Sequence, residues 1–236
     1  MLVLARLIAA LIRHGDYHQL ADTPSAHQPW PLNSEGEIQA QQGAQVLRDM
    51  LARNGWALVP SIDSSRLLRA WQTAVIFADG LADLTLSTPQ IESYDELAER
   101  GVGCLANLTI AQIEAVLHQD PRVADPPADW KANSHYRLPL QGAESLLEAG
   151  ERVAGHLSQS MAALPPDEHD RVKLFVGHGA AFRHAAYHLG VLAMEQLRQL
   201  SMFHCQPVMI ECLPGGRWRH VEGDWKMRPE SSRFTD

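Results

Sequence analysis

Two histidines follow apolar segments in the same local pattern, and imidazole is a side chain that can do chemistry. The run "LIAALI" leads through an arginine into His14 and Gly15, and the run "VKLFVG" leads into His178 and Gly179. A neutral imidazole is a nucleophile and a proton carrier, whereas a strand end that only packs favours Val or Ile. The repeated pattern therefore predicts that two buried strands deliver histidines to one site.

These histidines meet only if their strands belong to one parallel sheet. The carboxyl ends of parallel strands share an edge, where open α/β folds hold their sites. Gly15 and Gly179 allow sharp turns and close approach of the backbone to a ligand. The helix expected after Gly179 would point its amino-terminal N–H groups at the same place, which favours an anion. We therefore predict an anion-binding site at this edge, with Gly179 as part of it.

A third segment, "DSSRLLRAWQTA", places two arginines near the same edge. Arg66 and Arg69 lie three residues apart, so they should share one face of a helix that follows the second strand. The charge of Arg66 would oppose the helix dipole in the first turn. Arg69 would lie one turn deeper, where a buried guanidinium needs an anionic partner. We expect Arg69, rather than Arg66, to bind the anion through its bidentate fork.

Imidazoles, arginines and helix N–H groups together suit the transfer of a phosphoryl group to His14. Nearby arginines lower the pKa of an imidazole and keep it neutral near pH 7. The transferring group carries charge on three oxygens, which Arg13, Arg69 and the imidazole of His178 could stabilise without a metal. A carboxylic acid must then protonate the leaving oxygen. This chemistry requires no cofactor.

The remaining patterns predict an α/β fold, a three-layer sandwich in which helices flank a mostly parallel central sheet. The helix that begins at Asn33 or Ser34, its candidate caps, should end at Gly55. A closing hairpin should turn at 214–216. The strands are expected at 7–12, 57–65, 84–91, 172–177, 207–213 and 217–222, and the helices at 33–55, 66–81, 109–118, 143–164 and 180–190.

Composition excludes several classes of protein. The 236 residues are 45% hydrophobic, which suits one large domain with a sizeable core. A net charge of −8 disfavours a nucleic-acid-binding protein. The 3 cysteines are scattered and form no CxxC pair, so they fit a reducing compartment. The opening "MLVLARLIAALI" is too short to cross a membrane, and we interpret it as a strand rather than a signal peptide. A cytoplasmic location without a membrane partner is expected.

The motifs resemble, in order, those of the histidine phosphatase superfamily, also called the phosphoglycerate mutase-like family. The resemblance covers about residues 7–222 and rests on "LIRHG", "LNSEGEIQA", "SSRLLRAWQTA", "LAE", "GAES" and "VGHG". It implies a phosphoglycerate mutase-like sandwich, with residues 1–236 as a single histidine phosphatase domain. An insertion at about 100–142 would set specificity.

The resemblance also implies roles for individual residues. His14 falls on the family's phosphorylated nucleophile, and Arg13, Arg69 and His178 fall on its phosphate pocket. The family's general acid, which follows the third strand in an L-x-E context, falls on Glu99, although other carboxylates crowd the same loop. Glycine rather than aspartate follows His178, and in this feature the chain resembles the first branch of the superfamily.

Departures from the family pattern bear on the activity. First-branch mutases and bisphosphatases continue R-H-G with Glu and later Asn, whereas this chain has "DYHQL", and "RGVGCLAN" stands where W-E-G usually follows the acid. The strings "LIRHGDYH" and "EGDWKMRP" look more like the phosphoglycerate-mutase-like protein phosphatases of mitochondria. The expected function is a metal-independent phosphatase that forms a phosphohistidine on His14. A mutase-type phosphotransferase, a protein phosphatase for phospho-Ser, phospho-Thr or phospho-His, and a non-catalytic phospho-ligand-binding protein are the alternatives.

The substrate could be a phosphorylated small molecule or a phosphoprotein. His18, Arg66 and Arg137 are candidates for contacting it, and a solvated surface position is the alternative for each. His184 and His188 have the spacing of metal ligands, but without an HExxH glutamate helix packing is the better interpretation. An exposed edge strand could pair two copies in a homodimer.

Overall fold

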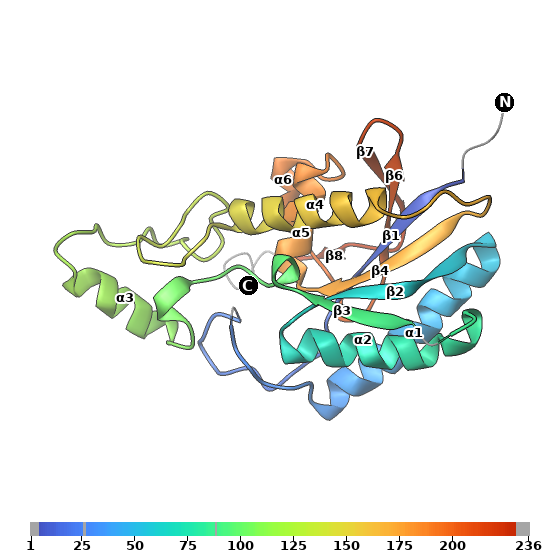
Figure 1. The fold of residues 1–236 in the computed structure, drawn as a ribbon. Coiled ribbons are helices and arrows are strands. Elements are labelled where there is room, and N and C mark those ends of the chain that lie inside the picture. Colours follow the sequence, from blue (N-terminus) through green and yellow to red (C-terminus); the bar gives the residue numbers. More distant parts are fainter. Residues whose placement is uncertain (1–4, 26, 88, 230–236) are drawn as a thin grey trace.

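The computed structural model describes residues 5–25, 27–87 and 89–229. Its main element is a six-stranded sheet between two layers of helices (Figure 1). The strand order is β3-β2-β4-β1-β6-β7, in which β1, β2, β3 and β4 run parallel and β6 is antiparallel to both of its neighbours. The strands are β1 (Leu7–Arg13), β2 (Ala57–Ser65), β3 (Gln90–Tyr94), β4 (Arg171–Gly177), β6 (Val208–Leu213) and β7 (Arg217–Glu222). The predicted α/β sandwich with a mostly parallel sheet is confirmed.

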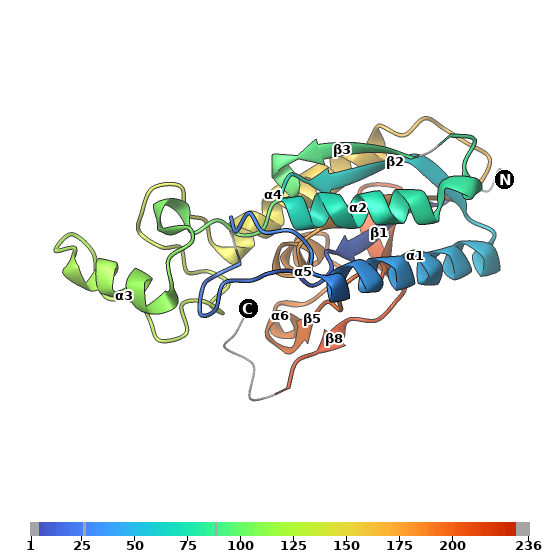
Figure 2. The same ribbon diagram turned by 90° about the horizontal axis from the view of Figure 1, so that it is seen from below.

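The helices cover both faces of the sheet. Helices α1 (Ser34–Asn54) and α2 (Leu68–Gly80) pack on one face, and α4 (Leu146–Ala162) and α5 (Gly179–His188) on the other (Figures 1 and 2). The remaining elements are α3 (Ile110–Gln119), α6 (Met194–Gln199), the short strands β5 (Leu200–Ser201) and β8 (Lys226–Met227), and the 3-10 turns η1 (Ala82–Leu84), η2 (Asp95–Leu97) and η3 (Gly103–Leu105).

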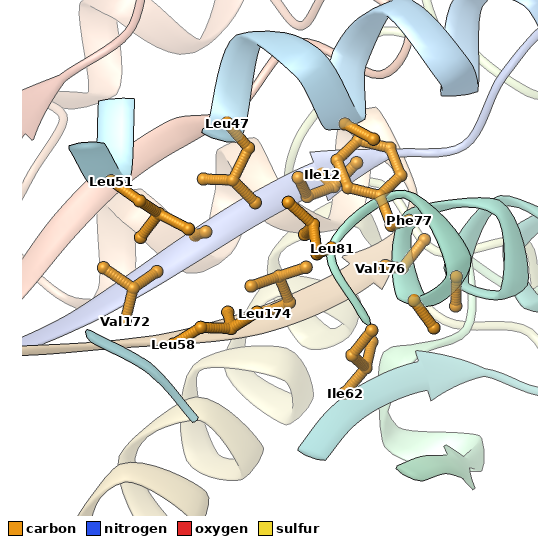
Figure 3. Packing of buried hydrophobic residues seen from close by; sticks show 14 of the residues in the cluster. Ile12, Leu47, Leu51, Leu58, Ile62, Phe77, Leu81, Val172, Leu174 and Val176 are labelled. Atoms are coloured by element: carbon orange, nitrogen blue, oxygen red, sulfur yellow. The ribbon is translucent and has the colours of Figure 1, made fainter. Parts of the chain in front are cut away.

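Alternating side chains of the central strands build two hydrophobic cores. Ile12 and Val176 pack against Leu47 and Phe77 of the α1/α2 layer, as Figure 3 shows. Residues one position earlier in β1 and β4 point to the α4/α5 layer. Burial on both faces explains why these strands are almost continuously apolar in sequence. It also fixes the carboxyl ends of both strands, where His14 and His178 follow.

Residues 102–143 form a lobe at one end of the sheet, with α3 projecting from it (Figures 1 and 2). The lobe has a small core of its own, which includes Ile113, Leu117 and Trp130. A bridge between Val102 and Ala143 closes its base. The lobe spans about the same residues as the specificity insertion expected at 100–142, and its role in specificity stays a prediction.

The ends of α1 follow from local sequence. Asn33 is the N-cap, because its Oδ1 accepts a hydrogen bond from the Gly36 N–H at 2.8 Å. Gly55 ends the helix in the left-handed region, at φ 67°. Of the two predicted caps, the structure therefore selects Asn33, and it confirms the end at Gly55.

The strand predicted at 84–91 is wrong. Residues 82–84 form η1, and β3 begins only at Gln90, which pairs with Ser61 of β2. Leu84 and Leu86 suggested a strand, yet both side chains are exposed. Pro89 has no N–H to donate to a ladder, which explains why pairing starts after it.

The predicted start of the helix at Arg66 is also wrong. Strand β2 extends to Ser65, Leu67 still has an extended backbone, and α2 begins at Leu68. The Ser65 hydroxyl accepts a hydrogen bond from the Leu67 N–H at 3.3 Å, which holds the chain in this turn. Arg66 therefore lies outside the helix and does not share a helix face with Arg69.

The prediction also missed α6, β5 and β8, which are too short to show periodicity. Within the described residues, no helix combines the length and the apolar character that crossing a membrane requires.

Candidate active site

The structure brings the two histidines together at the carboxyl ends of β1 and β4, which are neighbours in the sheet. The ring centroids of His14 and His178 lie 5.0 Å apart. Both side chains are almost completely buried, with exposed fractions of 3% and 1%. The backbone N–H of His14 donates to the Gly177 carbonyl at 3.0 Å, so the ladder between the strands continues up to the site.

Hydrogen bonds fix the tautomer of His14. Its Nδ1 lies 2.7 Å from the Gly15 carbonyl oxygen, and because a carbonyl only accepts, Nδ1 carries the proton. Its Nε2 accepts a hydrogen bond from Arg69 Nε at 3.2 Å. The lone pair of a neutral imidazole is therefore on Nε2, the nitrogen nearer to the arginine.

Glycine is required beside this histidine because two backbones almost touch. A Cβ atom at Gly15 would lie 2.4 Å from the Gly36 carbonyl oxygen in the first turn of α1. The Gly15 N–H donates to the Thr73 hydroxyl at 3.1 Å, and that hydroxyl donates to the Arg69 carbonyl at 2.8 Å. Helices α1 and α2 thus hold the turn that orients His14.

Arg69 is fully buried next to His14. One terminal nitrogen donates to the Gln28 carbonyl at 2.8 Å, and the other to the Ser25 carbonyl at 3.0 Å. The second of these also lies 3.4 Å from Nδ1 of His178. Arg69 therefore joins both imidazoles to the loop between β1 and α1. A phosphoryl group on Nε2 of His14 would place its oxygens within reach of the same guanidinium.

His178 has a defined tautomer as well. An arginine can only donate, so Nδ1 accepts from Arg69, and Nε2–H donates to the Ser65 hydroxyl at 3.0 Å. Ser65 is the last residue of β2. The ends of three neighbouring strands, β2, β4 and β1, thus contribute to one hydrogen-bonded group.

Burial and positive charge keep both imidazoles neutral. Burial is the main cause that lowers the pKa of His14 well below its usual range, and the charges of Arg69 and Arg13 lower it further. Burial and then Arg69 and Arg13 lower the pKa of His178 in the same way. An uncharged Nε2 is the form that a nucleophile requires.

We expect His14 to stay neutral, with its proton on Nδ1, as the pH falls through about 6.5, the usual pKa of histidine. Nitrogen-15 NMR of the ring nitrogens between pH 8 and 5.5 measures this directly, with free histidine as the control. Because the unfolded chain takes up protons first, the free energy of unfolding should fall below about pH 6.5. Conversion of His14 to imidazolium with a midpoint near 6.5 in the folded protein would contradict the assignment.

A cavity of about 380 Å³ opens in front of His14. Its lining is Arg13, His14, Tyr17, Gln19, Ser25, Glu99, Gly179, Ala180, Ser201, Lys226, Arg228 and Pro229. Arg69 and His178 contact His14 but are not part of this lining. Gly179 begins α5, so the positive end of the helix faces the cavity. A Cβ atom at Gly179 would lie only 3.0 Å from Cδ of Arg13, so glycine leaves room for that arginine.

Glu99 is the carboxylate that reaches the cavity. Its side chain is 9% exposed, and Oε1 accepts a hydrogen bond from the Arg100 N–H at 3.0 Å. Asp95 and Glu96, in the same loop, are exposed, and Asp95 pairs with Arg66 instead. Among the described lining residues Glu99 is the one acid, which makes it the geometric candidate for a proton donor.

The three candidates for substrate contact lie outside the described lining of the cavity. His18 is exposed on the loop after β1. The Arg66 side chain is 65% exposed and lies 3.4 Å from Asp95. Arg137 forms a hydrogen bond with Glu148 at 3.1 Å on the surface. Contact of these three residues with substrate therefore stays a prediction.

Sequence reasoning missed several residues that contact the histidines. The Tyr17 ring meets the His14 ring edge-on at 5.3 Å between centroids, and the Arg69 guanidinium lies 4.5 Å from the Tyr17 centroid. Nδ1 of His204 lies 2.7 Å from the His14 carbonyl oxygen, to which it donates. Ser65 lies within the motif "SSRLLRAWQTA" and was predictable from it, whereas His204 follows no local pattern.

The pair His184 and His188 is accounted for by hydrogen bonds. His184 lies between the Ser134 hydroxyl at 3.0 Å and the Ala180 carbonyl at 2.7 Å, and Nε2 of His188 lies 3.0 Å from the Leu147 carbonyl. In the part of the chain that the structure describes, no group of three or more His, Cys, Asp and Glu residues could hold a metal ion.

Two neutral, buried imidazoles thus lie together with arginines at the carboxyl edge of a mostly parallel sheet in an α/β protein. Residues 9–223 match the profile of the histidine phosphatase superfamily (branch 1). The chain therefore belongs to this superfamily, and the family predicted from the motifs is confirmed.

Solved structures share the fold. A structure described as mycobacterial hydrolase 2 aligns with a TM-score of 0.66 and 23% identity, covering 97% of this chain and 94% of that one. The native structure of mycobacterial glucosyl-3-phosphoglycerate phosphatase aligns with a TM-score of 0.65 and 24% identity, covering 92% and 96%. The structure of Bacillus stearothermophilus YhfR aligns with a TM-score of 0.64 and 22% identity, covering 92% of this chain and 97% of that one. None of the curated proteins compared with the chain is a significant match.

Proposed function

We propose that this protein is a metal-independent phosphatase that hydrolyses phosphomonoesters through a phosphohistidine on His14. The observation that carries the proposal is the state of His14: a neutral imidazole with its lone pair on Nε2, beside a cavity that Arg13 lines. Membership of the superfamily supports the reaction class. The fold that the chain shares with glucosyl-3-phosphoglycerate phosphatase is compatible with hydrolysis.

The reaction has two steps in this proposal. The hydrogen bond from Arg69 Nε to Nε2 of His14 first breaks, because it uses the lone pair that the nucleophile needs. Nε2 then attacks phosphorus, the bond from phosphorus to the ester oxygen breaks, and Glu99 in its acid form gives that oxygen a proton. Water then attacks the phosphohistidine, Glu99 takes a proton from the water, and the N–P bond breaks to restore His14. Arg13, Arg69 and the amino-terminal N–H groups of α5 stabilise the charge on the phosphoryl oxygens.

The Nδ1–H of His14 keeps its hydrogen bond to the Gly15 carbonyl through both steps. This bond stabilises the positive charge that develops on the ring when Nε2 bonds to phosphorus. His178, fixed by Ser65 and Arg69, presents a neutral imidazole beside the reacting group. The cavity accepts the phosphoryl group and the adjoining part of a small molecule. A cytoplasmic location remains a prediction.

The leaving group tests the role of Glu99. Glu99→Gln should lower kcat/KM for an alkyl phosphate by about 10²- to 10³-fold, because an alkoxide needs a proton to depart. With 4-nitrophenyl phosphate the loss in kcat/KM should be less than about tenfold, because nitrophenolate leaves as an anion and kcat/KM does not include the later hydrolysis of the phosphohistidine. Phosphate release is measured with EDTA present for both substrates.

Glu96→Gln is the matched control, since Glu96 is an exposed carboxylate in the same loop. Equal losses with both substrates would remove Glu99 from the acid role. Transfer of the phosphoryl group within one substrate, with no release to water, would replace the proposed phosphatase with a mutase.

A further inference from the structure

The carboxylate of Glu99 depends on its own loop for its position. Among the described residues, its one hydrogen bond comes from the backbone N–H of the next residue, Arg100, at 3.0 Å. A proton donor must keep a fixed place relative to the leaving oxygen if it is to act in the transition state. The backbone on both sides of Glu99 must therefore be held by other groups.

Arg152, on α4, holds the backbone that precedes Glu99. Its Nη1 lies within hydrogen-bond distance of three backbone carbonyl oxygens, those of Asp95 at 3.3 Å, Glu96 at 2.7 Å and Ala98 at 3.2 Å. Because Nη1 has two hydrogens, the three carbonyls share them. One charged donor thus fixes η2 and the residue directly before Glu99.

Glu144 holds the backbone that follows Glu99. Its Oε1 accepts a hydrogen bond from the Gly101 N–H at 2.9 Å, and its own N–H donates to the Gly101 carbonyl at 3.0 Å. The same carboxylate binds Arg152 through both oxygens, Oε1 to Nη2 at 2.5 Å and Oε2 to Nε at 3.3 Å. Arg152 and Glu144 together form a clamp that grips the chain on both sides of Glu99.

The clamp is itself anchored in the fold. The bridge between Val102 and Ala143 closes the base of the lobe directly beside Glu144. Ser145 then caps α4, since its hydroxyl accepts a hydrogen bond from the Glu148 N–H at 3.1 Å. Helix α4 therefore begins where the lobe ends, and η2 lies against this helix (Figure 1).

The clamp is stronger than an ordinary surface ion pair. The side chains of Arg152 and Glu144 are only 25% and 23% exposed. Two-point contact between guanidinium and carboxylate, with further acceptors for the remaining hydrogens, holds both groups in one geometry. The clamp also lies within electrostatic reach of the site: after burial, Arg69 and Arg13, the charge of Arg152 is the next cause that lowers the pKa of His178.

We propose that Arg152 and Glu144 are positioning residues, which hold Glu99 where it can protonate the leaving oxygen. This role rests on the proposed phosphatase function, in which Glu99 is the acid. Neither residue is among the described lining residues of the cavity, so both act through Glu99 rather than on the substrate. A clamp that only stabilised the fold would affect all substrates alike, whereas a clamp that positions an acid affects most the substrates that need a proton.

The test measures how strongly each variant depends on the leaving group. The two substrates are 2-phenylethyl phosphate, whose alkoxide needs a proton, and 4-nitrophenyl phosphate, which is of similar size and whose phenolate leaves as an anion. Arg152→Gln should lower kcat/KM by at least about tenfold for the alkyl ester and by less than about twofold for the aryl ester. The alkyl-to-aryl ratio should therefore fall at least about fivefold.

The same substitution is then made in the Glu99→Gln variant. A positioning residue acts through the residue that it positions, so the two effects should not add. With the acid removed, Arg152→Gln should change kcat/KM for 2-phenylethyl phosphate by no more than about twofold.

Arg48→Gln shows what the loss of a comparable arginine does elsewhere. Arg48, on α1, binds both oxygens of Asp83 and donates to the Gly80 carbonyl, and its side chain is 28% exposed. Gly80 is the last residue of α2, at the end opposite Arg69. This variant should lose stability in urea as Arg152→Gln does, yet keep the wild-type alkyl-to-aryl ratio.

Glu144→Gln is a milder variant that should fold even if Arg152→Gln does not. The amide keeps an oxygen for the Gly101 N–H but loses the charge that Arg152 binds. Its alkyl-to-aryl ratio should fall at least about threefold, because a neutral acceptor holds the guanidinium less firmly.

The outcomes separate the proposals from one another. Wild-type ratios in both Arg152→Gln and Glu144→Gln, or a full further loss when Arg152→Gln is added to Glu99→Gln, would overturn the positioning role and leave a phosphatase with its acid. A wild-type ratio in Glu99→Gln alone would overturn the acid role of Glu99, and the clamp's role with it. Absence of phosphate release by the wild-type protein from both esters would instead overturn the phosphatase proposal.

Discussion

Replacing His14 by alanine is expected to lower kcat/KM for phosphate release by at least about 10⁴-fold. The substitution removes the one atom, Nε2, that the proposed mechanism bonds to phosphorus. Arg69 and the α5 amino terminus would remain, and they could stabilise charge but could not form a covalent intermediate. Hydrolysis of 4-nitrophenyl phosphate in EDTA measures the loss, with circular dichroism to show that the variant is folded.

His169→Ala is the matched control for this experiment. His169 is an exposed histidine just before the amino end of β4, at the sheet edge opposite the site. The kcat/KM of the His169→Ala variant should equal that of the wild type within about twofold. Wild-type turnover in His14→Ala would rule out His14 as the nucleophile.

Arg69→Lys is expected to lower kcat/KM by roughly two orders of magnitude or more, which corresponds to about 3 kcal/mol of transition-state stabilisation. Arg69 donates to Nε2 of His14 through its Nε and approaches His178 through a terminal nitrogen. An ammonium group has no fork and cannot reproduce both directions at once. The substitution also removes donors to the Gln28 and Ser25 carbonyls, so unfolding in urea must be measured beside activity.

Arg66→Lys is the comparison for this prediction and should change kcat/KM by less than about tenfold. The structure gives a stronger reason than the sequence did, since Arg66 lies before α2, largely exposed, beside Asp95. An exposed ion pair of this kind contributes little to the free energy of folding. Equal losses in the two variants, or a larger loss for Arg66→Lys, would mean that the arginine of the site is wrongly assigned.

The parts of the site that the sequence predicted are those attached to regular elements. His14 and His178 follow buried strands whose apolar runs are plain in the sequence, and the order of elements places both strand ends at one edge. Arg69 was predicted because a guanidinium between apolar neighbours on a helix needs a partner. Glu99 came only from the family resemblance, and the structure then separated it from Asp95 and Glu96.

The parts that the sequence did not predict depend on contacts between distant segments. Nothing near Arg69 indicates that carbonyls of the loop after β1 accept its hydrogen bonds. Nothing near Lys226 indicates a two-residue strand that brings it to the cavity, because pairing with β5 decides that position. The start of α2 was misplaced since the apolar period includes Leu67, although Ser65 holds the preceding turn open. Tertiary packing overrides local propensity at such positions.

Trapping the covalent intermediate tests the central claim most directly. The wild-type protein is mixed with a ³²P-labelled phosphomonoester in EDTA, quenched in alkali within milliseconds to seconds, and digested with trypsin, which cleaves after Arg13. The account predicts an alkali-stable, acid-labile phosphate on the peptide that begins at His14, assigned by tandem mass spectrometry to His14 rather than His18 or His27, and formed at least as fast as phosphate is released. Phosphate release without protein-bound label, or label on a different residue, would contradict it.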